Sequence, residues 1–232
     1  MTPSTVTPAT TGALRALQEN RRSCRAFTSE PVPHDTLVDI VDAARLAPSW
    51  CNTQPWHVHI TEGIATEMFR AGLRDHIGVA PRQEPDIAFP ASYEGVYGER
   101  RRESGWQLYE SLGIAQGDRV ASGKQTLRNF DLFDAPHLAL VTTDRTLGTY
   151  GVLDCGIFVA NLLLAAHSRG VATIAQAALA SQAPFIREFF AIPDDRDVLL
   201  GISLGFSDDT HPANTFRTNR QPVSDVVSWK NS

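Results

Sequence analysis

The spacing of hydrophobic residues divides the chain into regular stretches separated by polar or proline-rich segments. Apolar residues three or four positions apart are typical of helices, whereas alternation with polar residues is typical of half-buried strands. Helical spacing predicts helices over 13–22, 35–47, 64–76, 99–113, 117–130, 149–168 and 184–190. Alternation and short apolar runs predict strands over 56–61, 137–143, 171–177 and 197–206. Asp35 is the expected N-cap of the second helix, which Pro48 ends.

The stretch 149–168 is the longest helical run and has apolar residues on nearly every face. A helix that is apolar all round is buried on all sides. We therefore expect this helix at the centre of the domain, with its apolar surface continuing into a subunit interface. Gly170 follows it as the expected C-cap, and residues 1–10 are expected to form a flexible arm.

Residues 77–130 interrupt this regular alternation. The first part of the segment contains Pro81, Pro85 and Pro90, and it is too irregular for core structure and too long for a simple connection. Because long loops are often functional lids, we interpret 77–130 as an insertion that shapes the active site within one domain spanning 1–232. Strands alternate with helices that also occur in pairs, which predicts an α+β fold with a mixed or antiparallel sheet flanked by helices.

Composition narrows the classes of function. With 232 residues, of which 42% are hydrophobic and 20% charged, the chain can bury a full core. Its net charge of -5 argues against a nucleic-acid partner. The three cysteines form no Cys-x-x-Cys pair, which predicts reduced thiols in a cytoplasmic protein. The N-terminus lacks a signal-peptide pattern, and the apolar run 156–166 is too short for a membrane span.

Two short motifs suggest other chemistries but lie in the wrong context. The segment 201–205 reads Gly-Ile-Ser-Leu-Gly, the nucleophile motif of α/β-hydrolases, yet Ser203 lies inside an apolar strand and no helix follows it. His57 and His59 share one strand face but have no third ligand nearby, so we predict solvent-facing positions and no metal. No Ser-His, Cys-His or paired-carboxylate arrangement remains. Either the protein is not an enzyme, or a cofactor supplies the chemistry.

Two polar clusters flank the second predicted helix. Arg21, Arg22 and Arg25 surround Ser23, and a guanidinium offers a planar fork of donors that matches phosphate oxygens. The loop 48–56 is bounded by prolines and rich in small hydrogen-bonding side chains, which are free to face a ligand. The two clusters predict a site for a phosphorylated ligand.

The segment 21–56 resembles the N-terminal signature of the FMN-dependent nitroreductase family, and most closely the branch of bacterial nitrobenzoate and dinitroaniline nitroreductases. The shared residues are Arg21-Arg22-Ser23-x-Arg25-x-Phe27, Pro31-x-Pro33 and Ala43-Ala44-Arg45-x-Ala47-Pro48-Ser49-x-x-Asn52-x-Gln54-Pro55-Trp56. A second match lies near the C-terminus, at Asn214-x-x-Arg217-x-x-Arg220-x-Pro222. The resemblance implies a three-layer sandwich, an entwined homodimer and FMN at the subunit interface.

The resemblance also implies roles for individual residues. Arg21, Ser23, Arg217 and Arg220 match the phosphate site, and Arg22 matches a position at the ribityl-phosphate end. Arg25 matches a cation at the pyrimidine edge of the flavin, where it would raise the flavin's potential. Residues expected to reach the flavin from the partner subunit are Pro48, Ser49, Asn52 and Gln54. The segment Ile174-Ala175-Gln176 aligns beside flavin N5 without the family's Pro-x-Glu-Gly pattern, and Asn129 aligns with an Asn that contacts the ring.

The reaction implied by the resemblance is a ping-pong reduction in which flavin N5, not a side chain, carries the hydride. NADPH or NADH would reduce FMN, and a nitroaromatic or quinone would then take two electrons. Candidates for stacking on a flat substrate are Trp50, Phe89, Tyr93, Tyr97 and Trp106. Two alternatives stay open: an FMN-binding or sensing protein with little turnover, and a flavoenzyme of the same fold that catalyses dehalogenation, dehydrogenation or flavin destruction.

Overall fold

A computed structural model describes residues 8–79 and 82–231 of the chain. Its α-helices are α1 (Pro8–Asn20), α2 (His34–Ala44), α3 (Ile64–Val79), α4 (Gly95–Ser111), α5 (Arg119–Leu127), α6 (Gly148–Ser168), α7 (Ala177–Ala180) and α8 (Ala183–Phe190). Its strands are β1 (Trp56–Thr61), β2 (His137–Asp144), β3 (Ala172–Gln176) and β4 (Arg196–Gly205). Each predicted helix and strand is therefore present, with shifts at the ends.

The four strands form one sheet in the order β1-β2-β4-β3, and all neighbours are antiparallel. β2 occupies an inner position and is almost entirely buried, because Leu138 and Leu140 enter the core on one face while Ala139 and Val141 enter the core on the other. A continuous apolar run is what a strand covered on both faces requires. Of the two sheet types predicted, the antiparallel one is observed.

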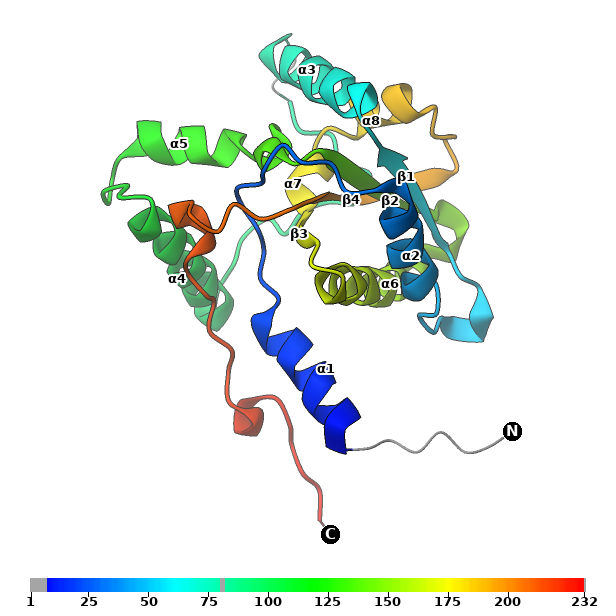
Figure 1. The fold of residues 1–232 in the computed structure, drawn as a ribbon, viewed down its shortest axis with the longest axis vertical. Coiled ribbons are helices and arrows are strands. Elements are labelled where there is room, and N and C mark those ends of the chain that lie inside the picture. The colour runs from blue at the N-terminus through cyan, green and yellow to red at the C-terminus, as the bar shows by residue number, and fades with distance from the viewer. Residues whose placement is uncertain (1–7, 80–81, 232) are drawn as a thin grey trace.

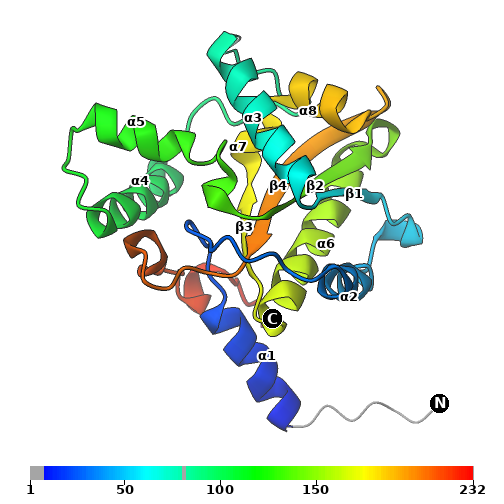
Figure 2. The ribbon, with the colours of Figure 1, turned by 45° about the horizontal axis from the view of Figure 1, so that its top comes forward.

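Helices cover both faces of the sheet (Figure 2). On one face α2 and α6 enclose a core that includes Ile40, Phe158 and Leu162. On the other face α3, α7 and α8 enclose a second core that includes Phe69 and Leu179. The predicted α+β sandwich of three layers is confirmed.

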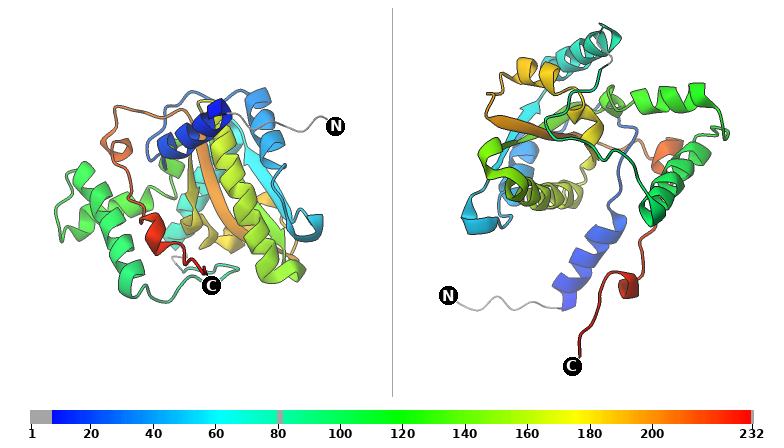
Figure 3. Two further views of the ribbon diagram at one scale, coloured as in Figure 1. Left: turned by 90° about the horizontal axis from the view of Figure 1, so that it is seen from below. Right: turned by 180° about the vertical axis from the view of Figure 1, so that it is seen from behind.

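Helices α4 and α5 stand beside these layers, next to the C-terminal segment (Figures 1 and 3). Gly98 is the buried residue of α4, and none of the residues of α5 is buried. These two helices lie within the predicted insertion 77–130, although α3 continues to Val79 and so occupies its first residues. The role of this segment as an insertion that shapes the site stays a prediction.

The beginning of the chain differs from expectation at two helix starts. α1 begins at Pro8 and so takes in the end of the expected arm 1–10, whose first seven residues lie outside the described part. Asp35 is not the N-cap of α2, because Pro33 holds the extended conformation before the helix and its carbonyl accepts the first backbone hydrogen bonds. Asp35 lies in the first turn instead.

The expectation that α6 is buried on all sides is wrong for the single chain. Phe158 and Leu162 pack on the sheet, but Leu153 is 58% exposed and Ile157 37% exposed on the opposite face. The stretch Arg145–Ser168 is long and apolar enough to cross a membrane by composition alone. Its packing against β2 and β3 is that of the central helix of a globular domain. Gly170 follows the C-cap Arg169 with a φ of 73°, a conformation that favours glycine.

Candidate functional site

The arginine-rich segment after α1 lies along the outer edge of β3. α1 ends at Asn20, so Arg21 and Arg22 lie just beyond the helix rather than in its last turn. Ser23 forms a parallel bridge with Thr173, and the N–H of Cys24 donates to the carbonyl of Thr173 at 3.0 Å. The chain is thereby fixed in an extended conformation that presents its side chains at the edge of the sheet.

The C-terminal segment is held against this edge by Asn214, which is buried. Its side-chain oxygen accepts a hydrogen bond from the N–H of Arg25 at 2.7 Å, and its side-chain nitrogen donates to the carbonyls of Ala26 and Asp208. Arg217 follows three residues later and donates to the carbonyl of Asn214. Asn214 begins the second sequence match, but its role in joining the two ends of the chain was not predicted.

The two ends of the chain together line a cavity of about 480 Å³. This volume is in the range of small-molecule sites. The predicted residues in its wall are Arg21, Arg22, Ser23, Arg25, Arg217 and Arg220. The structure therefore brings together the predicted phosphate-binding residues from both ends of the chain.

Among the residues that the structure describes, most of the guanidiniums in this cavity have no carboxylate partner. Arg22 pairs with Asp209, but its Nε is buried without a hydrogen-bond partner. None of the other arginines of this cavity forms an ion pair with another described residue. Burial first, and then the nearby charge of Arg220, lower the pKa of Arg21. Burial followed by the charge of Arg22 lowers the pKa of Arg217. Because both lowered pKa values reflect a penalty on the charged forms, an anion in the cavity would stabilise the cluster.

The free edge of β3 continues from this cavity. The carbonyl of Thr173 points outward to Cys24, and because the direction alternates along a strand, the backbone N–H of Ala175 points to the same edge. Ala175 is exposed, whereas the side chain of Gln176 is buried and donates to the backbone carbonyl of Asn129 at 2.8 Å. The predicted segment Ile174-Ala175-Gln176 and Asn129 are therefore neighbours.

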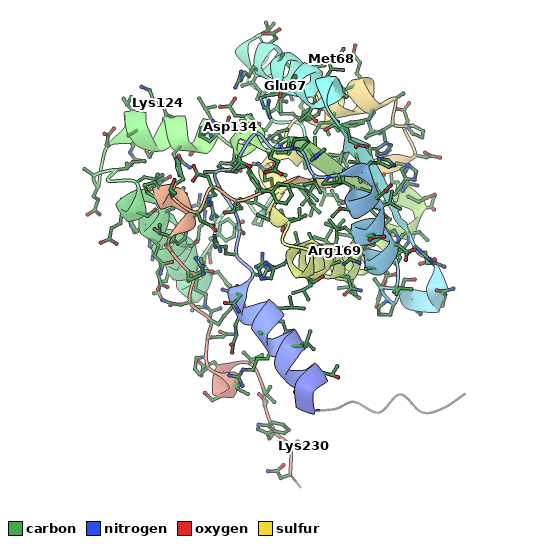
Figure 4. The ribbon with its side chains drawn as sticks, in the orientation of Figure 1. Glu67, Met68, Lys124, Asp134, Arg169 and Lys230 are labelled. Atoms are coloured by element: carbon green, nitrogen blue, oxygen red, sulfur yellow. The ribbon has the colours of Figure 1, made fainter. Side chains whose placement is uncertain are left out.

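The loop 48–54 lies elsewhere, beside the first turns of α6. The N–H of Trp50 donates to the buried carboxylate of Asp154 at 3.0 Å, and the Trp50 ring lies 4.4 Å from that of Tyr150. The arginine-rich segment instead meets the far end of α6, where His167 lines a cavity with Arg21 and Arg22. Arg169, labelled in Figure 4, marks that end of the helix. At 1.5 Å per residue, Tyr150 and His167 are about 25 Å apart.

One chain therefore does not bring its two polar clusters together. The loop residues Pro48, Asn52 and Gln54 are exposed. Ser49 fixes the loop's shape, because its hydroxyl accepts from the N–H of Gln54 at 3.0 Å. Cys51, Asn52 and Gln54 all have positive φ angles. The loop is ordered by contacts within it and with α6, and these three side chains face outward.

The predicted stacking aromatics do not gather at one place. Trp106 lines a cavity with Arg25 between α4 and α5, whereas Tyr93 and Tyr97 line a shallower one at the start of α4. Trp50 lies on the distant loop, and Phe89 lines none of the cavities described above.

The hydrolase motif is structural. The hydroxyl of Ser203 is buried within β4 and donates to the side-chain oxygen of Gln176. A Cβ on Gly201 would lie 2.4 Å from Leu179, so this glycine lets α7 pack closely on the sheet.

His59 is half-buried rather than solvent-facing. Its ring packs 4.7 Å from that of His57 and 5.4 Å from that of Phe190, and burial lowers its pKa. No cluster of three or more metal-ligating side chains occurs in the part of the chain that the structure describes.

An antiparallel sheet between two helical layers, with a cationic cavity at its edge, defines an α+β protein whose cavity suits an anionic ligand. A model of the nitroreductase family matches residues 19–206. A 4-nitrobenzoate reductase of Nocardioides sp. (strain LMS-CY) is 35% identical over 94% of this chain and 90% of its own length. A nitrobenzene nitroreductase of Ectopseudomonas oleovorans is 32% identical over 92% of this chain and 95% of its own.

Among solved structures, the FMN-dependent nitroreductase NfnB from Mycobacterium smegmatis in complex with NADPH superimposes with a TM-score of 0.90. It is 30% identical, and the match covers 95% of this chain and 99% of that one. The chain belongs to the nitroreductase family, and the predicted family and fold are confirmed.

Proposed function

We propose that this protein is an FMN-dependent oxidoreductase that uses NADPH or NADH to reduce nitroaromatic compounds. The observation that carries the proposal is the convergence of Arg21, Arg25, Arg217 and Arg220 on one cavity, where none of the four forms an ion pair with a residue that the structure describes. The relatives support the same activity, since they are nitrobenzoate and nitrobenzene reductases and an NfnB enzyme that is FMN-dependent. The predicted cofactor and class of enzyme agree with them.

The residues of the cavity fit an FMN phosphate. Arg21, Ser23, Arg217 and Arg220 would hold its oxygens, and Arg22 would bind at the ribityl-phosphate end through its unpartnered Nε. A phosphate would also relieve the repulsion among these guanidiniums.

FMN supplies a two-electron redox centre when it is bound. Arg25 holds a fixed positive charge, and contact with the Phe216 ring at 5.3 Å orients its guanidinium. We assign Arg25 to the pyrimidine edge of the ring, where a cation stabilises added negative charge. The edge of β3 offers the backbone N–H of Ala175 between Ile174 and Gln176, and Asn129 adds a second polar contact. No acidic side chain is required, because water can supply protons.

In our proposal, a second copy of the chain completes the site. Pro48, Ser49, Asn52 and Gln54 are too far from the arginine cavity of their own chain to share its ligand. Leu147, just before α6, forms an exposed apolar stripe with Tyr150, Leu153 and Ile157 on α6. A homodimer across this stripe would bury it and bring the loop of one subunit to the cavity of the other. The free thiols of Cys24, Cys51 and Cys155 agree with a cytoplasmic location.

An anaerobic absorbance titration of the purified protein tests the proposal. The protein should be yellow, or become yellow with added FMN, and NADPH or NADH should bleach its flavin band. A band that persists would favour a flavin-binding or sensing protein, and a panel of nitroarenes with product analysis would separate nitroreduction from other flavin chemistry. A colourless protein that FMN cannot reconstitute would overturn the proposal.

A further inference from the structure

A second, larger cavity lies between α4 and α5. Its volume is about 760 Å³, and its wall includes Arg25, Arg101, Arg102 and Arg119. The acidic residue in the wall is Asp118, and its carboxylate is the N-cap of α5, where it accepts from the N–H of Ala121 at 2.9 Å. The cavity therefore has a strong excess of positive charge although the whole chain has a net charge of -5.

The arginines of α4 are not equivalent. Arg100 donates to the side chain of Gln221 in the C-terminal segment and does not line this cavity. Arg101 and Arg102 line it, and Arg119 approaches from α5. None of these three forms an ion pair within residues 8–79 and 82–231. Guanidiniums from two helices thus surround one space with their charges unneutralised.

The same cavity has an aromatic wall. Trp106 and Tyr109 line it, and their rings meet edge to face with centroids 5.8 Å apart. Trp106 is 40% exposed, so its ring is available for stacking. An aromatic surface beside guanidiniums suits a flat ring that carries an anionic group, because the ring stacks while the charge is paired.

Arg25 connects this cavity to the one assigned to FMN, because it lines both. Arg25 is half-buried, and this burial lowers the pKa of its guanidinium. A substrate held by its anionic end between α4 and α5 would extend its other end toward Arg25.

We propose that Arg101, Arg102 and Arg119 form a specificity subsite that binds the carboxylate of an anionic nitroaromatic substrate, with Trp106 as the stacking surface. This inference rests on the proposed function and adds a substrate class to it. Arg101 and Arg102 project from one helix and Arg119 from another, so the carboxylate is bound between α4 and α5.

The test compares two substrates of equal shape, 4-nitrobenzoate and its neutral counterpart 4-nitrobenzamide. In the FMN-loaded protein, Arg102→Gln and Arg119→Gln should each raise the KM for 4-nitrobenzoate roughly tenfold, as expected for loss of a charged hydrogen bond. The KM for 4-nitrobenzamide and both kcat values should change less than about twofold, because the neutral amide forms no ion pair with these guanidiniums. Arg100→Gln is the matched control and should leave all these values unchanged.

A binding measurement separates this inference from the proposed function. Calorimetry with benzoate and benzamide, which have no nitro group to reduce, should show weaker benzoate binding in Arg102→Gln and Arg119→Gln and no change with benzamide. This result is independent of turnover, so an inactive protein would contradict the proposed function alone. Equal losses for the charged and neutral ligands would overturn the subsite. A change confined to the KM for NADPH would also overturn it, because the arginines would then serve the nucleotide.

Discussion

Each arginine in the smaller cavity has a different local environment, and this decides what its removal should do. Arg22 is tied to Asp209, Arg25 packs on Phe216, and Arg217 donates to backbone carbonyls. Arg220 is exposed, and within the described part of the chain its guanidinium donates hydrogen bonds only to Thr218 and Asn219, the two residues before it. Its guanidinium therefore contributes little to the fold and is available to a ligand.

We expect Arg220→Ala to weaken FMN binding without destabilising the protein. Loss of one charged hydrogen bond should cost about 1.5–3 kcal/mol, or roughly 10- to 150-fold in the dissociation constant. Fluorescence titration of the apoprotein with FMN measures this change. Arg45→Ala, which removes an exposed arginine paired with Asp42 on α2, serves as the control. An unchanged FMN affinity in Arg220→Ala would remove this residue from the phosphate site.

Arg25→Ala should lower the reduction potential of the bound flavin, because a positive charge near the ring favours its reduced form. A loss of about 1.4–2.8 kcal/mol corresponds to roughly 30–60 mV for a two-electron couple. Arg25→Lys keeps the charge and should recover most of the potential. Redox titration of the three proteins gives the comparison, and equal potentials would exclude an electrostatic role for Arg25.

At the scale of elements, the loop 48–54 depends on α6 for its shape. Cys51, Asn52 and Gln54 adopt left-handed angles, and non-glycine residues keep such angles only when surrounding contacts hold them. Asp154 provides one of these contacts, since the residue is 4% exposed and its carboxylate accepts from the N–H of Trp50. Asp154 is a positioning residue for the loop.

Asp154→Ala should lower the free energy of unfolding by about 1–3 kcal/mol, because the N–H of Trp50 loses its acceptor. If the loop reaches the flavin of a partner subunit, the same substitution should also weaken FMN binding. Asp154→Asn retains a side-chain oxygen and should preserve most of both properties. Thermal unfolding and FMN titration of each variant separate the two effects. Reduced stability with full FMN affinity would leave Asp154 a role in folding alone.

Several elements were predictable because their signals are local. The predicted bounds of β1, Trp56–Thr61, match the structure, since the strand follows Pro55 and ends before the turn at Gly63. The predicted N-cap of α2, Asp35, was wrong because Pro33 occupies that position, and it forms no side-chain hydrogen bond to the helix. The arginine cavity was predictable in composition because both of its segments carry recognisable motifs. The separate positions of the aromatic candidates could not be predicted. The spacing of residues in 77–130 does not determine how α4 and α5 are oriented on the domain.

At the scale of the whole molecule, α6 is less buried within one chain than its apolar sequence predicts. The sequence is apolar on nearly every face of this helix, but the chain covers only the side that contacts the sheet. Hydrophobic spacing does not distinguish burial by the same chain from burial by another copy. The exposed stripe of Leu147, Tyr150, Leu153 and Ile157 is therefore the main evidence for a partner.

Ile157→Glu should convert the protein to a monomer, since a charge in a closely packed apolar interface has no partner and loses its water. Analytical ultracentrifugation measures this directly. FMN affinity should fall at least tenfold in the same variant, because in the proposed dimer the loop of the second subunit would supply several polar contacts. Ile64→Glu is the matched control: Ile64 is 75% exposed at the start of α3, away from α6. A monomeric Ile157→Glu that binds FMN with full affinity would show that one chain forms the whole flavin site, and a wild-type protein that is already monomeric would exclude the dimer itself.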